Sequence, residues 1–356
     1  MEKKIKIGNR LIGDNEPLYF VADIGANHDG DLDRAYKLIE IAKDAGADAA
    51  KFQNFRASTI VSKRGFESLG KKLSHQKSWE KSVYKVYEDA SLPYEWTPKL
   101  KERCDKVGIE YFTSPYDFDS VDKVDPYVSI YKVGSGEITW LEIIEYIARK
   151  HKPIMIATGC SEMEDVIRAM DTLLSFTNDV VLMQCNTNYS AYESNIKYIN
   201  LRVLETYRSH FPNVLLGLSD HTLGYTSVLG GVVLGAVVFE KHFTDDNSRE
   251  GPDHKFAMTP GLWKEMVQRA NELYLALGDG KKRIEKNEKE SAIVQRRALR
   301  YTRELHANYL LKSNDIIALR PFEKDSIPPF RINEIIGRKL VKDVCFQGSV
   351  KWGDLE

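Results

Sequence analysis

Two apolar runs that each end in a polar cluster decide how this chain folds: VLLGLSDHT at residues 214–222 and AVVFEKHF at residues 236–243. Both runs are rich in the β-branched and aliphatic residues of buried strands, and each has a histidine at its end, His221 and His242. A single histidine after a strand is usually a packing residue. Two histidines at matched positions on neighbouring strands leave two explanations open, ordinary packing and a shared divalent ion.

The same kind of run recurs along the chain, with helical stretches between the runs. Eight runs occur, at residues 18–24, 48–53, 109–114, 128–133, 153–158, 180–185, 214–219 and 236–241. Eight buried-type strands that alternate with helices predict a parallel sheet, and eight is the number that closes a (β/α)8 TIM barrel. The competing architecture, an open doubly wound sheet, is typical of a G-x-G-x-x-G turn after the first strand. DIGANHDG at residues 23–30 lacks that pattern.

The rest of the chain predicts an insertion and a second domain. Residues 54–92 interrupt the pattern after the second strand, where barrel loops often cover an active site, although a surface excursion without function is the alternative. A charged stretch follows the last helix. We therefore expect a barrel domain at residues 1–280, a linker at 281–290 and a small β-rich domain at 291–356, with RKLVKDV (338–344) as one of its strands.

Composition and charge exclude several classes of function. The chain carries 51 basic and 52 acidic side chains, which argues against a nucleic acid or an anionic membrane as partner. No run of about 18 apolar residues predicts a membrane span, and the polar N-terminus lacks a signal-peptide core. The four cysteines stand far apart, as expected in a reducing compartment. We therefore expect a cytoplasmic protein.

Polar side chains end every apolar run, and in a parallel barrel the carboxyl ends of the strands carry the chemistry. Lys51 and Lys132 are the most informative, because they interrupt apolar strands where a lysine needs a compensating anion. One interpretation is a receptor for phosphate or carboxylate, completed by hydroxyl groups and the N–H groups of the VGSGE turn. The other pairs each lysine with a carboxylate, from Asp23, Glu137 or Glu240.

A series of motifs, taken in order, resembles the sialic acid synthase family: DIGANHDG, KFQ, FTSPYD, YKVGSGE, ATG, GLSDHT, and EKHFTDD with GPDH. The resemblance implies a (β/α)8 TIM barrel followed by a small antifreeze-like β-clip domain. It also implies a domain-swapped homodimer, in which the small domain covers the barrel of the other subunit. The implied reaction joins phosphoenolpyruvate to an N-acylated amino hexose resembling N-acetylmannosamine. The product is a nine-carbon 2-keto acid of the sialic, legionaminic or pseudaminic type, and phosphate is released.

The resemblance also implies roles for individual residues. A divalent metal ion, manganese first and magnesium or cobalt as alternatives, is implied on His221 and His242. Phosphoenolpyruvate is implied to bind Lys51, Ser114, Lys132, Ser135, Thr187 and Ser219. Contacts to the acceptor sugar are implied for Gln53, Tyr189, Glu240, Asp253 and Arg320. Asp23 and Glu137 fall at catalytic positions together with the two histidines, and Glu137 falls where the family handles protons and water.

Three departures from the family pattern concern the acceptor and the phosphate. Asp23 stands where the family usually has a glutamate, and Ser190 in the CNTNYS run stands where a proline is expected. In the small domain, FEKDSIPPF replaces a glycine-containing loop after Arg320 and Pro321. Two other hypotheses stay open: a phosphoenolpyruvate-dependent synthase that acts on another or a phosphorylated aldose, and a carbohydrate-binding barrel without catalysis.

Overall fold

A closed barrel of parallel strands forms the first part of the molecule. The computed structural model describes residues 2–356, which divide into two compact units, one ending at Gly278 and the other spanning Asp279–Glu356. Within the described residues, eight strands close the barrel, and the last pairs with the first. They are β3 (Tyr19–Asp23), β4 (Ala49–Asn54), β5 (Glu110–Pro115), β6 (Tyr131–Val133), β7 (Ile154–Ala157), β8 (Val180–Cys185), β9 (Leu215–Asp220) and β10 (Val238–His242). These strands coincide with the eight apolar runs, so the prediction of a TIM barrel is confirmed.

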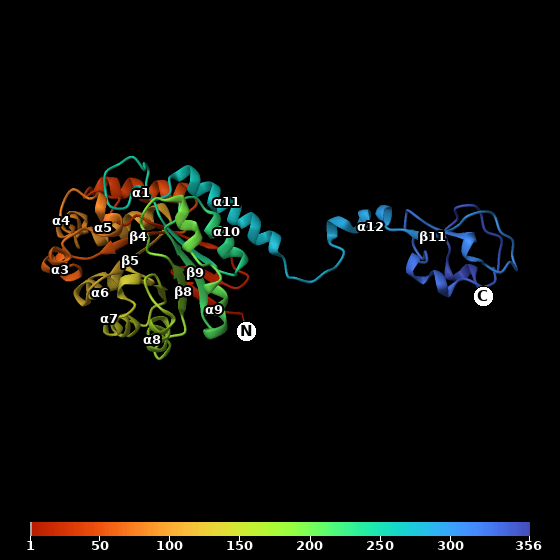
Figure 1. Ribbon diagram of the computed structural model, residues 1–356, viewed down its shortest axis with the longest axis horizontal. Helices are drawn as coiled ribbons and strands as arrows, with labels where there is room; N and C mark the ends of the chain where they lie inside the picture. The colour runs from red at the N-terminus through yellow and green to blue at the C-terminus, as the bar shows by residue number, and fades with distance from the viewer. Residues whose placement is uncertain (1) are drawn as a thin grey trace. The chain divides into compact units, whose positions relative to one another are not determined.

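A helix follows each barrel strand, and the helices surround the strands (Figure 1). They are α1 (Leu32–Asp44), α5 (Trp96–Val107), α6 (Phe118–Val124), α7 (Leu141–Ala148), α8 (Met163–Leu174), α9 (Val203–His210), α10 (Thr226–Val233) and α11 (Pro260–Leu277). The start of α1 shows why a helix begins at this point of the sequence. The side chain of Asp31 accepts hydrogen bonds from the N–H groups of Asp33 and Arg34, a cap that contributes about 1 kcal/mol. No helix in the described part of the chain is long and apolar enough to cross a membrane.

An antiparallel hairpin covers the amino-terminal end of the barrel. Its strands are β1 (Lys4–Ile7) and β2 (Arg10–Gly13). The buried side chains of the hairpin belong to the same apolar core as the barrel strands: Ile5, Ile7 and Ile12. Arg10 Nη2 donates a hydrogen bond of 2.7 Å to the carbonyl oxygen of Leu18, the residue before β3. The hairpin is therefore fastened to the barrel both by apolar contact and at a strand start.

The insertion after β4 folds into short helices. These are α2 (Ala57–Ile60), α3 (Lys63–Ser68), η1 (Ser74–Ser78) and α4 (Val83–Ala90). Phe55 packs edge-on against Tyr87 of α4, with ring centroids 5.6 Å apart. From η1, the ring of His75 lies 5.1 Å from that of Tyr189, which follows β8. The insertion therefore reaches over the carboxyl-terminal end of the barrel.

Short 3-10 turns complete the connections of the first unit. They are η2 (Asp125–Tyr127), η3 (Ser135–Glu137) and η4 (Glu193–Tyr198). Of these, η3 follows β6 directly and carries two of the predicted site residues, Ser135 and Glu137.

The second unit has a small apolar core of its own, which includes Leu299 and Tyr301. Its regular elements are η5 (Lys286–Glu288), α12 (Lys289–Gln295), the antiparallel pair β11 (Ala298–Tyr301) and β12 (Ile316–Leu319), η6 (Ser313–Asp315), η7 (Pro329–Glu334) and η8 (Trp352–Asp354). The segment expected to be a linker, residues 281–290, contains η5 and runs into α12.

The prediction of a strand at residues 338–344 is wrong. The segment makes isolated bridges instead, Leu340 with Leu355 and Val344 with Leu305. Because successive backbone groups bond to different segments, no continuous ladder forms along it.

Candidate active site

The polar side chains that follow the apolar strands form one layer at the carboxyl-terminal end of the barrel. Strand register places His242 beside Asp23, and Asp23 beside Lys51. Ser219 lies beside Glu240 in the same way. All five residues are at most 5% exposed. We call this group the polar layer, and it lies where parallel barrels hold their catalytic groups.

Both buried lysines are paired with carboxylates, as the structural interpretation predicts. Lys51 Nζ lies 2.7 Å from Asp23 Oδ2 and 3.8 Å from Glu240 Oε1, and Lys132 Nζ lies 3.3 Å from Glu240 Oε1. Burial alone would raise the pKa of Glu240, but the charges of Lys132 and Lys51 lower it to about 2. Burial raises the pKa of Asp23, although the charge of Lys51 opposes it. A lysine carries three donors, so the pairing leaves donors for an anion.

Several buried polar atoms here have no hydrogen-bond partner among residues 2–356. They are Asp23 Oδ1, Ser114 Oγ, Glu137 Oε2, Glu240 Oε2 and His242 Nδ1. A buried polar atom without a hydrogen-bond partner lowers the stability of the folded state by about 1–3 kcal/mol. Such atoms are therefore few in folded proteins, and a group of them often marks a binding site. All five come from predicted site residues at one end of the barrel, which points to a polar ligand there.

Two of the hydroxyl residues expected to hold phosphoenolpyruvate meet at Gly159, after β7. Ser135 Oγ accepts a hydrogen bond of 2.9 Å from the N–H of Gly159. A Cβ atom added at Gly159 would lie 2.4 Å from Thr187 Cγ2 and 2.9 Å from Ser135 Oγ, so a larger residue would push the loops apart. A third hydroxyl, Ser219 Oγ, donates to Glu240 Oε1 at 3.1 Å. These hydroxyls therefore line the β6 to β9 side of the barrel mouth.

Glu137 has the properties of an acid–base group. Burial raises the pKa of Glu137 to about 7, although the charge of Lys132 acts in the opposite direction. A carboxyl group with a pKa near neutrality can both accept and return a proton at physiological pH. Tyr116 lies close to Glu137, and both side chains approach Gly134. A Cβ added at Gly134 would be 2.6 Å from Glu137 Oε2 and 3.4 Å from the Tyr116 hydroxyl.

His221 and His242 face one another with ring centroids 5.3 Å apart. His221 Nδ1 pairs with the carbonyl oxygen of Asn186 at 2.9 Å, which leaves Nε2 as the free ligand atom. His242 Nε2 lies 3.5 Å from Asp23 Oδ2. Burial, together with the other ring, lowers the pKa of His221 to about 3, and burial lowers that of His242 to about 4. Both rings are therefore neutral near pH 7, the form that binds metal ions.

This donor set suits an open metal site rather than a closed one. In the described part of the chain, no three side chains among His, Cys, Asp and Glu converge as a metal cage. Two neutral imidazoles fit a divalent ion whose other ligands come from water and substrate. Imidazole nitrogen suits first-row transition ions, whereas Mg²⁺ prefers oxygen ligands. The residues therefore fit manganese or cobalt better than magnesium.

Tyr189 is the centre of an aromatic cluster beside the histidines. Its ring centroid lies 4.4 Å from that of His221, 6.2 Å from His242 and 5.4 Å from Phe256. His75 of the insertion closes the cluster from the other side. The insertion therefore contacts a predicted site residue, and its role as a cover of the active site stays a prediction.

Ser190 shapes the turn that carries Tyr189. Its N–H donates a hydrogen bond of 3.0 Å to Asn188 Oδ1, and the N–H of Asn188 donates one of 3.1 Å to Asn186 Oδ1. Asparagine side chains that bond two residues onward define Asx turns. A proline at position 190 would lack the N–H, so it could not make the bond to Asn188 that holds this turn.

Gln53 and Asp253 lie at the other side of the layer. Gln53 Nε2 donates a hydrogen bond of 3.2 Å to Asp23 Oδ2, and Asp253 Oδ2 lies 3.6 Å from His242 Nδ1. Gly25, with φ +50°, permits this approach. A Cβ there would lie 2.8 Å from Asp253 Oδ2 and 3.3 Å from His242 Nδ1.

Arg320 belongs to the second unit, where it follows β12 and is exposed. The other predicted site residues all lie in the first unit.

Sequence reasoning assigned no role to four aromatic residues in or near the site: His75, Tyr87, Tyr116 and Phe256. Burial and the charges of Asp253 and Glu137 raise the pKa of Tyr87. Tyr116 and Phe256 lie in or beside the motifs FTSPYD and GPDH, so those motifs held a usable signal. His75 and Tyr87 lie in the insertion, where nothing in the local sequence marks them.

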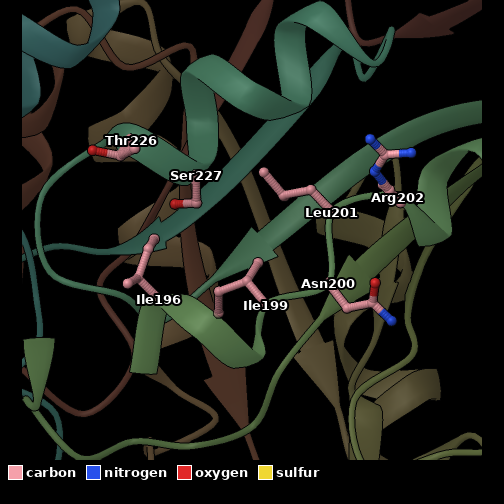
Figure 2. A pocket seen from close by; sticks show the side chains of 7 residues that line it. All are labelled: Ile196, Ile199, Asn200, Leu201, Arg202, Thr226 and Ser227. Carbon is pink, nitrogen blue, oxygen red and sulfur yellow. The ribbon is translucent and has the colours of Figure 1, made fainter. Parts of the chain in front are cut away.

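A separate pocket of about 270 Å³ opens between the β8–α9 connection and the start of α10 (Figure 2). Its walls include Ile196, Leu201 and Ser227. The hydroxyl of Ser227 donates to Asp220, on the outer side of β9. The pocket shares no lining residue with the predicted site within residues 2–356, so we do not assign it to the chemistry.

A TIM barrel whose strands end in a buried layer of lysines, carboxylates and histidines has the arrangement in which barrel enzymes hold their catalytic groups. Comparison with protein families matches residues 38–282 to the NeuB family. The chain is 33% identical to the N,N'-diacetyllegionaminic acid synthase of Legionella pneumophila, over 97% of this chain and 96% of that protein. It is 30% identical to the pseudaminic acid synthase of Campylobacter jejuni, over 99% of this chain and 100% of that protein.

A solved structure agrees with these relatives. The N-acetylneuraminic acid synthetase of Leptospira borgpetersenii, crystallised with citrate, matches with a TM-score of 0.71 and 26% identity, over 82% of this chain and 95% of that one. The chain therefore belongs to the NeuB family, and the resemblance seen in its motifs is confirmed.

Proposed function

We propose that this protein condenses phosphoenolpyruvate with an N-acylated amino hexose. The product is a nine-carbon 2-keto sugar acid, and phosphate is released. The group of partnerless polar atoms around Lys51 and Lys132 carries the proposal, because it describes a buried receptor for a small, highly polar ligand. The relatives named as legionaminic and pseudaminic acid synthases support the same reaction.

Phosphoenolpyruvate fits the inner part of the site. It carries a phosphate and a carboxylate, which suit the free donors of the two lysines. We assign the hydroxyls of the same region to its oxygens: Ser114, Ser135, Thr187 and Ser219. Ser114 Oγ is buried without a partner among the described residues, which supports its assignment.

The acceptor sugar fits the outer part of the site, in its open-chain aldehyde form. We assign Gln53, Tyr189, Glu240 and Asp253 to its hydroxyl and amide groups. We assign His221 and His242 as ligands of a divalent ion, which when bound supplies Lewis acidity to the aldehyde oxygen. The aromatic cluster around Tyr189 limits the access of water to this region.

The residues then act in a defined sequence. The lysines hold phosphoenolpyruvate so that its C3 faces the aldehyde carbon, and a C–C bond forms between the two. We assign proton transfer at the aldehyde oxygen to Asp23, whose pKa burial raises. C2 becomes electron-poor, and Glu137 removes a proton from the water that adds there. The hemiketal phosphate collapses to the ketone, its C2–O bond breaks, and phosphate leaves.

The second unit has a place in the same proposal. We assign it an antifreeze-like fold and a domain-swapped homodimer, in which Arg320 of one subunit enters the barrel of the other. Arg320 is exposed and far in sequence from the polar layer, which fits a contribution across subunits. We assign the protein to the cytoplasm, since its four cysteines are all free.

Phosphate release tests the reaction. The purified protein is incubated with phosphoenolpyruvate, Mn²⁺ and one acceptor at a time: N-acetylmannosamine, a six-carbon sugar with two acetamido groups, or a phosphorylated aldose. Release with an N-acylated sugar is the expected result, and mass spectrometry identifies the nine-carbon acid. Release only with the phosphorylated aldose would replace the proposal by the rival synthase. No release with any acceptor would contradict the proposal and favour the hypothesis of a carbohydrate-binding barrel without catalysis.

A further inference from the structure

His254 follows Asp253 directly but contacts a different set of residues. Its side chain is 0% exposed. Its Nε2 lies 2.8 Å from Asp29 Oδ1, and its Nδ1 lies 2.8 Å from Thr244 Oγ1. Asp29 comes from the loop after β3, and Thr244 follows β10. One buried ring therefore ties the loop of Asp253 to the ends of two adjacent strands.

The Asp29 end of this link is fixed independently. Arg249 Nε donates a hydrogen bond of 2.9 Å to Asp29 Oδ2, and Arg34 Nε lies 3.0 Å from the same oxygen. Burial alone would raise the pKa of Asp29, but the hydrogen bonds from His254 and Arg249 lower it. The carboxylate is therefore charged, accepts hydrogen bonds from His254 and Arg249 and forms an ion pair with Arg34, which makes it a rigid anchor.

The loop backbone is closed by further hydrogen bonds. Asn247 Nδ2 donates to the carbonyl oxygens of His254 and Ala257, each at 2.7 Å. The N–H of Met258 donates to the carbonyl oxygen of His242 at 2.8 Å. A Cβ added at Gly251 would lie 2.6 Å from His254 Cδ2, so the loop also packs tightly on the ring.

Asp253 itself is held weakly by comparison. Its side chain is 18% exposed, and its Oδ2 accepts one hydrogen bond of 3.2 Å, from the N–H of Ala26. The direction of its carboxylate therefore depends on the loop around it. We propose that His254, Thr244 and Asp29 are positioning residues that hold Asp253 in the orientation needed to bind the acceptor sugar. This inference rests on the proposed function of Asp253.

Paired variants test the link. Thr244→Val removes the hydroxyl and keeps the shape, whereas Thr244→Ser keeps the hydroxyl. Thr244→Val is expected to raise the KM for N-acetylmannosamine about tenfold and to leave the KM for phosphoenolpyruvate within about twofold, the size of one lost hydrogen bond at the acceptor alone. Thr244→Ser is expected to behave like the parent protein. His254→Leu and His254→Gln repeat the comparison, because Gln retains a donor near Asp29.

Two outcomes would overturn the inference. Unchanged KM values in soluble, folded Thr244→Val would show that the link does not orient Asp253. An equal rise in both KM values, with a lower melting temperature, would show a role in folding only. His210→Leu, on the exposed face of α9, controls for loss of a histidine.

The same variants separate this inference from the reaction proposed above. If the parent protein releases no phosphate with any acceptor, the proposed reaction fails, and amide hydrogen exchange then tests the link alone. Thr244→Val is expected to speed exchange in residues 251–257, and Thr244→Ser is not. Equal exchange in the two variants would refute the link whatever the reaction is.

Discussion

Asp220 and Lys241 form an ion pair across β9 and β10, with both side chains at most 2% exposed. Lys241 Nζ also donates to the carbonyl oxygen of Thr222 at 2.7 Å, and the Thr222 hydroxyl donates to Asp220 Oδ2 at 2.9 Å. Side chains alternate along a strand, so this pair lies on the outer side while His242 lies on the inner side. The ion pair therefore fixes the strand ends on which the histidines stand.

Breaking this pair is expected to destabilise the barrel. Lys241→Met leaves the Asp220 carboxylate buried without its charge partner, which costs about 3–5 kcal/mol. Urea unfolding, followed by tryptophan fluorescence, measures the loss. Asp220→Leu combined with Lys241→Met is expected to recover part of it, because no unpaired charge remains. Lys85→Met, which removes an exposed ion pair, serves as the control and is expected to leave the midpoint unchanged. A midpoint for Lys241→Met equal to that of Lys85→Met would contradict the assignment.

Glu137 is expected to give the reaction a dependence on pH near neutrality. The pKa of Glu137 is raised to about 7, and the proposed base must be ionised. The rate of phosphate release should therefore fall as pH drops below about 7. Glu137→Gln should lower the rate by about a hundredfold or more. Glu164→Gln, exposed on α8, is the matched control. A flat profile between pH 6 and pH 8 would remove Glu137 from the role of base.

Glu137 is also expected to make the stability of the folded protein depend on pH. Its pKa is about 7 in the folded protein against an ordinary 4.5, so between these values the folded state keeps a proton that the unfolded state has released. Stability should then fall as pH rises from 4.5 to 7. Glu137→Gln is expected to lessen this fall, which melting temperatures across the range would show. An identical fall in both proteins would contradict the raised pKa.

His221 is expected to hold the metal ion without being needed for folding. His221→Ala should weaken binding of Mn²⁺, followed by the paramagnetic resonance signal of the free ion, and should abolish metal-dependent phosphate release. Circular dichroism should show an unchanged fold, because His221 lies at a strand end. His210→Ala, on the surface of α9, should bind Mn²⁺ like the parent protein. Full activity after treatment with EDTA and desalting would refute a metal-dependent reaction.

Arg320 is expected to act across subunits. Arg320→Ala and Lys132→Met should each be inactive alone in the proposed dimer. Mixing the two after dissociation should restore part of the activity, because a mixed dimer has one barrel with Lys132 that receives an intact Arg320 from its partner. Gel filtration and phosphate release measure the two properties together. A fully active monomer, or mixtures without any recovery, would contradict the swapped arrangement.

The sequence predicts the barrel well because each strand is recognisable by two features, an apolar run and a polar residue at its end. It predicts the polar layer for the same reason, since the ends of parallel strands must meet. It leaves the lysines ambiguous between carboxylate partners and a bound anion. The structure shows why: Lys51 and Lys132 contact carboxylates and still retain donors.

Other features depend on contacts that no local pattern reveals. Lys241 lies between two predicted site residues, and only strand alternation separates its outward side chain from theirs. The cluster of His75, Tyr189 and Phe256 joins segments distant in sequence. In the second unit, residues 338–344 look like a strand because a short run of Leu and Val stands among charged residues, yet their backbone groups bond to separate loops.

The hairpin β1–β2 has a consequence for the order of events. It packs apolar side chains against the core at the amino-terminal end of the barrel, so the predicted site faces the opposite, carboxyl-terminal end. In the proposed reaction, phosphoenolpyruvate binds beside Lys51 and Ser219 at the strand ends, and the acceptor sugar binds beside Tyr189 and Asp253 in the loops. We therefore expect ordered binding, with phosphoenolpyruvate first, and release of phosphate after the sugar acid.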